Sequence, residues 1–197
     1  MTLLTARRTW ARRTVPAAAL ALALAGTVAS CSNNPASEAD SSPQTQSASG
    51  SAESDSAAMP PWPAPADVPA RVTRAGLDLG PMGMAEHYHP QLRIIINGDE
   101  VPVPPGIGVD PNTGAMSAVH THEGDGTIHI EASEAGEAFT LGQVFTQWGV
   151  TLTTTQIGGV RAKAGQNVTV ISNGAAVAGD PMKLRLEPNQ KIVVQLQ

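Results

Sequence analysis

The chain has 197 residues, of which 12 are basic and 17 acidic, so its formal net charge is −5 with neutral histidines. This acidic balance disfavours binding to nucleic acid, because phosphates attract basic surfaces. The single cysteine, Cys31, has no partner for a disulfide within the chain and cannot form a multi-thiolate metal site. A metal ion would therefore have to be held by histidine, carboxylate, methionine or water.

Residues 1–30 have the pattern of a secretory signal peptide, with four arginines, no acid and then an apolar run over residues 17–25. The segment ends in Val28-Ala29-Ser30 before Cys31, which resembles the lipobox of bacterial lipoproteins. In that family the cysteine is acylated, for example with palmitate, and becomes the new N-terminus. The resemblance implies a lipid anchor on Cys31 that holds the protein at the extracytoplasmic face of the cell membrane. An ordinary signal peptide is the alternative, and the paired arginines do not decide between Sec and Tat export.

Residues 31–69 follow as a stretch rich in serine, alanine, proline and acidic residues, with few large apolar side chains. Such a composition buries too little surface to offset the entropy of ordering, so it predicts a disordered tether. Trp62, in a proline cluster, is expected either to pack on the edge of the domain or to have no specific role. Without residues 1–30 the chain has eight basic and 17 acidic residues, a formal charge of −9.

Residues 70–197 are predicted to form one globular domain, and its first clear element is a β-hairpin over residues 91–103. Asn97-Gly98 joins two β-prone runs there, which is the strongest short signal for a two-residue hairpin turn. This turn places Ile94 opposite Val101.

One amphipathic helix is predicted over residues 139–150, where Leu141, Val144, Phe145 and Trp148 recur at helical spacing. Thr140 and Gln143 can form a capping box, and Gly149 suits the position after the last turn. Further strands are predicted at residues 150–155, 167–172, 182–186 and 191–196. The fold class is therefore mainly β, of the α+β type, with an antiparallel sheet and one packed helix.

All five histidines fall in two clusters, of which the segment from residue 120 to 131, HTHEGDGTIHIE, carries three. His-x-His in a strand directs two imidazoles to the same face. A turn over residues 123–126 would fold His129 back opposite His120 and would place His122 opposite Thr127. We therefore predict a metal site with His120, His122 and His129 as the first ligands. His87 and His89 either complete this site or form a second one.

Several carboxylates accompany the histidines, and strand parity puts Glu131 on the face of His120 and His129. It is predicted as a fourth ligand, as an acceptor for an imidazole N–H or as a general base. Glu123 and Asp125 lie in the turn, where solvation is the simpler expectation, and Asp125 suits the turn geometry. Glu86 is the remaining carboxylate beside the first histidine pair.

Copper and zinc both suit an imidazole-rich site, and the sequence favours copper only slightly. Met82 and Met84 precede His87, and thioethers beside imidazoles suit copper. Methionines near a core are also common packing residues. Zinc fits three histidines with a carboxylate or water equally well.

Three segments together resemble a group of uncharacterised secreted or membrane-attached prokaryotic proteins. They read HYHPQLRIIINGDEVPVPPGIGV, HTHEGDGTIHIE and FTLGQVFTQWGV, and they span roughly residues 86–150. The group has no established activity, so the resemblance implies a real domain with a purposeful histidine set and implies no reaction.

Three functions follow from these features. The first is a membrane-anchored, extracytoplasmic lipoprotein that binds, buffers or delivers copper or zinc. The second is a metalloenzyme, either a hydrolase or an oxygenase-like protein, with Glu131 or Glu123 as the base. The third is a metal-free interaction module in which the histidines respond to pH.

Overall fold

The structure is a computed structural model, and it describes residues 58–197. The predicted signal peptide, Cys31 and most of the predicted tether lie outside the described residues. Along the chain the elements are α2 (Val68–Arg74), β1 (Leu79–Gly80), β2 (Glu86–Tyr88), β3 (Gln91–Ile96), β4 (Asp99–Val101), β5 (Met116–Ser117), β6 (Val119–His120), β7 (His129–Ala132), α3 (Leu141–Trp148), β8 (Leu152–Thr153), β9 (Gln156–Ile157), β10 (Val160–Arg161), β11 (Val168–Ser172), β12 (Ala175–Val177), the 3-10 helix η1 (Pro181–Lys183) and β13 (Lys191–Leu196).

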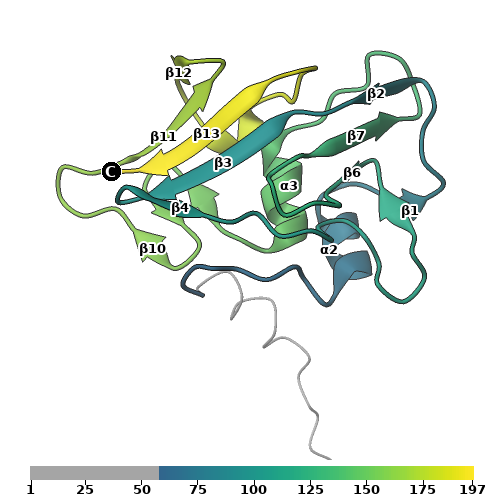
Figure 1. The fold of residues 1–197 in the computed structure, drawn as a ribbon, viewed down its shortest axis with the longest axis horizontal. Helices are drawn as coiled ribbons and strands as arrows, with labels where there is room; N and C mark the ends of the chain where they lie inside the picture. Colours follow the sequence, from purple (N-terminus) through teal and green to yellow (C-terminus); the bar gives the residue numbers. More distant parts are fainter. Residues whose placement is uncertain (1–57) are drawn as a thin grey trace, which may run out of the picture. The chain divides into compact units, whose positions relative to one another are not determined.

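The largest sheet has five strands in the order β12-β11-β13-β3-β4, and a separate three-stranded sheet has the order β2-β7-β6. All strand pairs are antiparallel except β3 with β13, which run parallel over their whole length. Chain segment β2 leads directly into β3, so one continuous stretch connects the small sheet to the large one (Figure 1). The prediction of a mainly β domain with antiparallel sheets is confirmed.

The predicted hairpin is formed by β3 and β4. Asn97 and Gly98 both have positive φ, at 54° and 96°, as the two-residue turn requires. The register pairs Ile94 with Val101, as predicted. Because alternate side chains of a strand point to opposite faces, this register directs both residues into the core.

Helix α3 has the predicted ends. Thr140 and Gln143 form the capping box, and Gly149 follows the helix in the left-handed conformation with φ of 81°. Its apolar stripe is part of the main core. The same helix also contacts the small sheet, because the buried Gln147 donates from Nε2 to the carbonyl oxygen of Val119 in β6 at 3.0 Å.

The packed region begins before Ala70, where the sequence placed the start of the domain. Trp62 is buried in the main core, and its ring makes an edge contact with Trp148 at a centroid distance of 5.7 Å. The indole of Trp148 donates to the carbonyl oxygen of Pro63 at 2.9 Å. Two aromatic rings thus supply the burial that the composition of this stretch lacks, so its last part packs on the domain.

Two other predictions differ from the structure. Helix α2 was not predicted, because seven residues with few apolar positions give only a weak periodic signal. The strand predicted at residues 182–186 is wrong, since a 3-10 helix occupies residues 181–183. Asp180 accepts from the backbone N–H of Met182 at 3.0 Å, and Pro181 follows it with a φ suited to a helical start.

Candidate metal centre

The sheet formed by β2, β7 and β6 brings the histidines from three separate segments into one row. Its central strand, β7, begins with His129, which pairs directly with His120 of β6. On the other side, the pairs Tyr88–Ile130 and Gln91–Thr127 belong to one antiparallel register. This register puts His89 opposite His129, and their ring centroids are 4.6 Å apart. The row therefore runs from His89 through His129 to His120.

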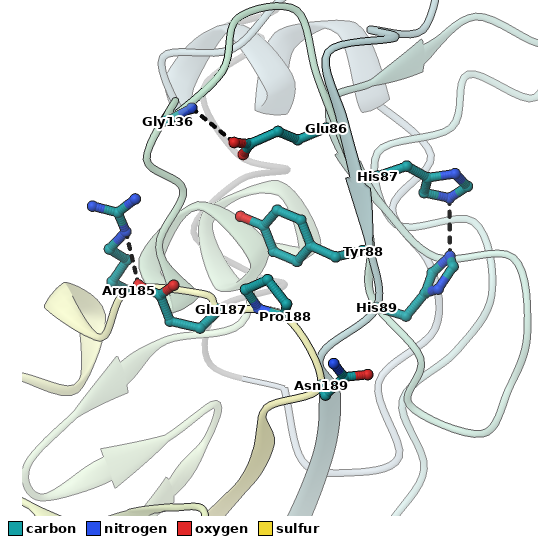
Figure 2. Close-up of a pocket in the computed structure, with 9 residues that line it drawn as sticks. All are labelled: Glu86, His87, Tyr88, His89, Gly136, Arg185, Glu187, Pro188 and Asn189. Atoms are coloured by element: carbon teal, nitrogen blue, oxygen red, sulfur yellow. Dashed lines mark hydrogen bonds and ion pairs between the residues drawn. The ribbon is translucent and has the colours of Figure 1, made fainter.

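The predicted division of faces is confirmed on β7. Ile128 and Ile130 are wholly buried on the core side, as is Thr121 after β6. On β2 the same alternation holds, because Glu86 and Tyr88 point to one side of the strand while His87 and His89 point to the other (Figure 2). The imidazoles thus gather on one face of a sheet whose other face is core.

The predicted pairing of His122 with Thr127 is wrong, because the two strands separate after His120 and His129. The pairing of β6 with β7 ends at His120 and His129, while Thr127 pairs with Gln91 on the other side of the strand. Thr121 exchanges backbone hydrogen bonds with the loop before β5, donating to Ile107 at 3.0 Å and accepting from Gly106 at 2.8 Å. The chain after His120 therefore pairs with the loop before β5, and the segment that carries His122 and Glu123 connects the two separated strands.

The five imidazoles form two groups that share one residue. His120, His122 and His129 have ligand atoms within 4.8 Å of one another, and so do His87, His89 and His129. We call these the inner triad and the outer triad. Each includes three side chains of a type suited to zinc or copper. The first histidine pair therefore lies beside the second cluster and shares His129 with it.

Within each triad, two imidazoles already face each other through Nε2. The Nε2–Nε2 distance is 3.0 Å between His120 and His122 and 2.9 Å between His87 and His89. Zinc binds histidine nitrogen at about 2.0–2.1 Å, so two imidazoles on a tetrahedral ion are separated by about 3.3 Å. For one ion to bind both rings of a pair, the two nitrogens would have to separate by a few tenths of an ångström and the Nε2 proton of the donating ring would have to move to its Nδ1.

The buried His120 has a defined tautomer. Its Nδ1 lies 2.8 Å from the carbonyl oxygen of Ser117, which can only accept, so Nδ1 carries the proton. Desolvation by burial lowers the pKa of His120 from its ordinary 6.5 to about 4. At neutral pH the ring is therefore uncharged and has its lone pair on Nε2, where His122 donates to it and where an ion would bind.

A buried framework behind His120 holds that carbonyl in place. The hydroxyl of Ser117 lies 2.6 Å from the carbonyl oxygen of Val119 and 2.7 Å from Oε1 of Gln147 in α3. The sequence did not single out Ser117 or Gln147. The only signal was a glutamine next to Trp148 on a largely apolar helix. These two residues connect the inner triad to the core helix.

We expect the metal-free fold to lose stability as the pH falls from 6.5 towards 4. Over this range the unfolded chain protonates His120 while the folded chain does not, so protons favour unfolding. Between pH 7.5 and 5 this single group accounts for about 2 kcal/mol. Urea unfolding of the full-length protein in a chelator at both pH values measures the loss. His120→Gln, which cannot titrate, should lose less, and an equal loss in both proteins would contradict the assignment.

Two carboxylates contact the histidines, and the closer one is Glu123. Its Oε2 accepts from Nε2 of His129 at 3.0 Å, and this hydrogen bond lowers the pKa of Glu123. Glu131, which parity favoured, pairs with His87 across β2 and β7, with 3.6 Å between Oε1 and Nε2 of the histidine. Asp125 has the predicted turn role, since it accepts from the backbone N–H of Thr127 at 2.9 Å. The sequence predicted a solvated Glu123, because its contact with His129 depends on the curvature of the loop, which strand parity does not describe.

The two methionines of the segment before β2 are on or near the surface. Met84 is 94% exposed, so it has no packing role, and Met82 is half-buried. The general expectation that a methionine here belongs to the core therefore fails for Met84. The choice of copper over zinc stays a prediction.

A pocket of roughly 590 Å³ lies beside β2, and its walls include Tyr88, Arg185 and Glu187 (Figure 2). His87 and His89 also line it, although their rings point to the opposite side of the strand from Glu86 and Tyr88. The charged groups of the pocket are already paired. Arg185 forms an ion pair with Glu187 at 2.9 Å, and Glu86 accepts from the backbone N–H of Gly136 at 2.9 Å.

We found no family model that matches the chain, no similar protein among the curated ones and no similar solved structure. Among residues 58–197, no helix has the length and apolar character needed to span a membrane. The resemblance to bacterial lipoproteins and to the prokaryotic group stays a prediction. The described domain has histidine clusters that could hold a metal ion, and this is the property on which a function can be built.

Proposed function

We propose that the protein is a membrane-anchored, extracytoplasmic lipoprotein that binds copper or zinc for buffering or delivery. One observation carries the metal-binding part: five histidines from three segments form two triads around His129. A structural role would not explain why four of these rings meet in Nε2–Nε2 pairs on the same face of a sheet. Within the described domain this is the only place where three or more potential nitrogen or carboxylate ligands come together in this way.

The donor set selects the class of ion. Imidazole suits zinc, copper, nickel and iron, whereas magnesium and calcium prefer sets of oxygen ligands. Three histidines leave a fourth position for water or for Glu123, whose Oε2 lies 3.0 Å from Nε2 of His129. His120 is already neutral at pH 7, so an ion does not have to displace a proton from it.

The location is supported by the sequence alone. The lipobox before Cys31 and the polar stretch that follows it would tether the domain to the outer surface of the cell membrane. A domain with excess negative charge on such a tether would attract cations near the membrane. Labelling of the protein with a radioactive or clickable fatty acid in its bacterial host, lost in Cys31→Ser, tests this part separately.

Elemental analysis of the metal-loaded, dialysed full-length protein tests the metal-binding part. We expect one zinc or copper ion per chain and no retained magnesium or calcium. His120→Ala/His122→Ala should lose the tightly bound ion, while Arg93→Ala, which removes only an exposed ion pair with Glu100, should keep it. The proposal fails if the wild-type protein holds no stoichiometric ion and the double variant has the same melting temperature as wild type with and without metal.

Glu123→Gln should reduce zinc affinity by about 10-fold, with the fold unchanged. The amide keeps the shape but loses the negative charge that orients His129 and strengthens it as a donor, and loss of such a partner typically costs 10–100-fold. Competition with a chelator of known affinity measures the change. Glu134→Gln, on an exposed loop, is the matched control. Equal affinities of the Glu123 and Glu134 variants would show that the carboxylate has no part in the site.

A metalloenzyme is the second candidate, favoured by the open fourth position that three histidine ligands leave. The adjoining pocket does not favour it, because the rings of His87 and His89 point to the opposite side of β2 from Glu86 and Tyr88, which also line the pocket. A substrate beside Tyr88 would lie on the other side of β2 from an ion held by these two rings. Hydrolysis of activated phosphate or carboxylate esters by the zinc-loaded protein, abolished in Glu131→Gln, would restore this candidate.

A further inference from the structure

We infer that the inner and outer triads are successive positions of one ion, which is captured and released through the outer triad and retained by the inner one. This inference rests on the proposed metal binding and adds a route to it. The shared ligand, His129, would stay bound while the pair His87 and His89 is exchanged for the pair His120 and His122.

The first argument concerns the number of ions. A neutral imidazole has one lone pair, so His129 can serve one ion at a time. Because Nε2 of His129 donates to Glu123, the lone pair of the neutral ring lies on Nδ1, and binding through Nε2 instead would require Glu123 to move away. Two ions would need both nitrogens and the loss of the N–H proton. The two triads are therefore alternatives rather than two independent sites.

The second argument concerns the difference between the triads. His87 and His89 are both exposed, and within residues 58–197 the one ion pair they form is that of His87 with Glu131 at 3.6 Å. His120 is 1% exposed, and it is anchored by Ser117, which is itself held by Gln147. A ligand fixed by buried hydrogen bonds holds an ion longer than one that moves freely in water. The outer triad thus suits rapid exchange with solvent or a partner, and the inner triad suits retention.

The third argument concerns the path between the positions. The rings of His89 and His120 lie on opposite sides of His129, with centroid distances of 4.6 and 5.4 Å to it. In the transfer, bonds from the ion to Nε2 of His87 and His89 break as bonds to Nε2 of the inner pair form. The oxidation state does not change. The proton that His122 carries on Nε2 moves through water to its Nδ1, so the net charge is conserved.

Rates of zinc uptake and release test whether the outer triad is the path to the inner triad or only an additional set of ligands. Full-length wild type, His87→Ala/His89→Ala and His120→Ala/His122→Ala are each loaded with zinc and mixed with excess chromogenic chelator in a stopped-flow instrument. We expect one ion per wild-type chain. The outer double variant should keep its equilibrium affinity within about threefold, while zinc uptake and release both slow by at least about tenfold. The inner double variant should bind at least about tenfold more weakly and release zinc faster.

Equal slowing of uptake and release at unchanged affinity is the signature of a lost route, and a purely structural effect of the substitutions would not produce it. Two zinc ions per wild-type chain would overturn the inference, as would an outer double variant that exchanges zinc at wild-type rates. A wild-type protein that binds no ion would instead refute the proposed function itself. The two failures are therefore distinguishable in one set of measurements.

Discussion

Replacing His129 by alanine should reduce zinc or copper affinity by at least about 100-fold, more than any other single histidine substitution. His129 is the only histidine in both triads, so its loss leaves neither triad complete. His87→Ala removes one exposed ligand of the outer triad and should cost about threefold or less. The comparison scale is the 10–100-fold that loss of a supporting partner alone commonly costs. Competition titrations of both variants against the same chelator measure the difference.

The fold of the His129 variant should persist, because the imidazole lies on the outer face of the sheet and Ile128 and Ile130 fill the core beside it. Circular dichroism and the melting temperature in chelator check this. If His129→Ala bound metal as tightly as His87→Ala, the two triads would not depend on a common ligand. The arrangement of the site would then have to be reconsidered from its central strand outwards.

Gly126→Ala should destabilise the metal-free domain by at least about 3 kcal/mol and should also weaken metal binding. Gly126 has φ of 85°, and a Cβ there would lie 2.0 Å from the carbonyl oxygen of Leu92. Its own carbonyl oxygen accepts from the backbone N–H of Leu92 at 2.8 Å. This close contact between the turn and β3 sets the position from which the chain returns to His129.

The matched control is Gly136→Ala. Gly136 has a similar φ of 78°, but a Cβ there would meet no atom within 4 Å. It should therefore cost only the backbone strain of a left-handed alanine, about 1–2 kcal/mol, and leave metal affinity unchanged. Urea unfolding in chelator and zinc titration compare the two variants. Equal losses of stability would mean that the turn yields easily and that Gly126 does not fix the hairpin.

Local patterns in the sequence were sufficient for the parts of the site that lie within one hairpin. Alternation placed Ile128 and Ile130 in the core and the histidines on the opposite face of the sheet, and the turn residues between them gave the pairing of His120 with His129. The ends of α3 and the register of β3 with β4 followed in the same way, because caps and two-residue turns depend on a few neighbouring residues.

The relation between the two histidine clusters could not be obtained in this way. It depends on β2 pairing with β7, more than 40 positions later in the chain, and no residue within either strand encodes its neighbour. The same holds for Glu123, whose contact with His129 needs the curved loop, and for Trp62, whose burial needs Trp148 of α3. Strand alternation predicted which face of the sheet each side chain occupies, whereas long-range strand pairing determined which side chains lie next to each other on that face.

The short Nε2–Nε2 contacts place two of the three imidazoles of each triad close to the separation that two ligands of one ion have. An ion held by one pair would open that pair by a few tenths of an ångström, and Ile128 and Ile130 on the core face of the sheet would not have to move. Loading would then be nearly invisible in the shape of the domain. A partner protein that distinguishes the full from the empty form would have to sense the two positive charges added to an acidic surface, or to take the ion itself.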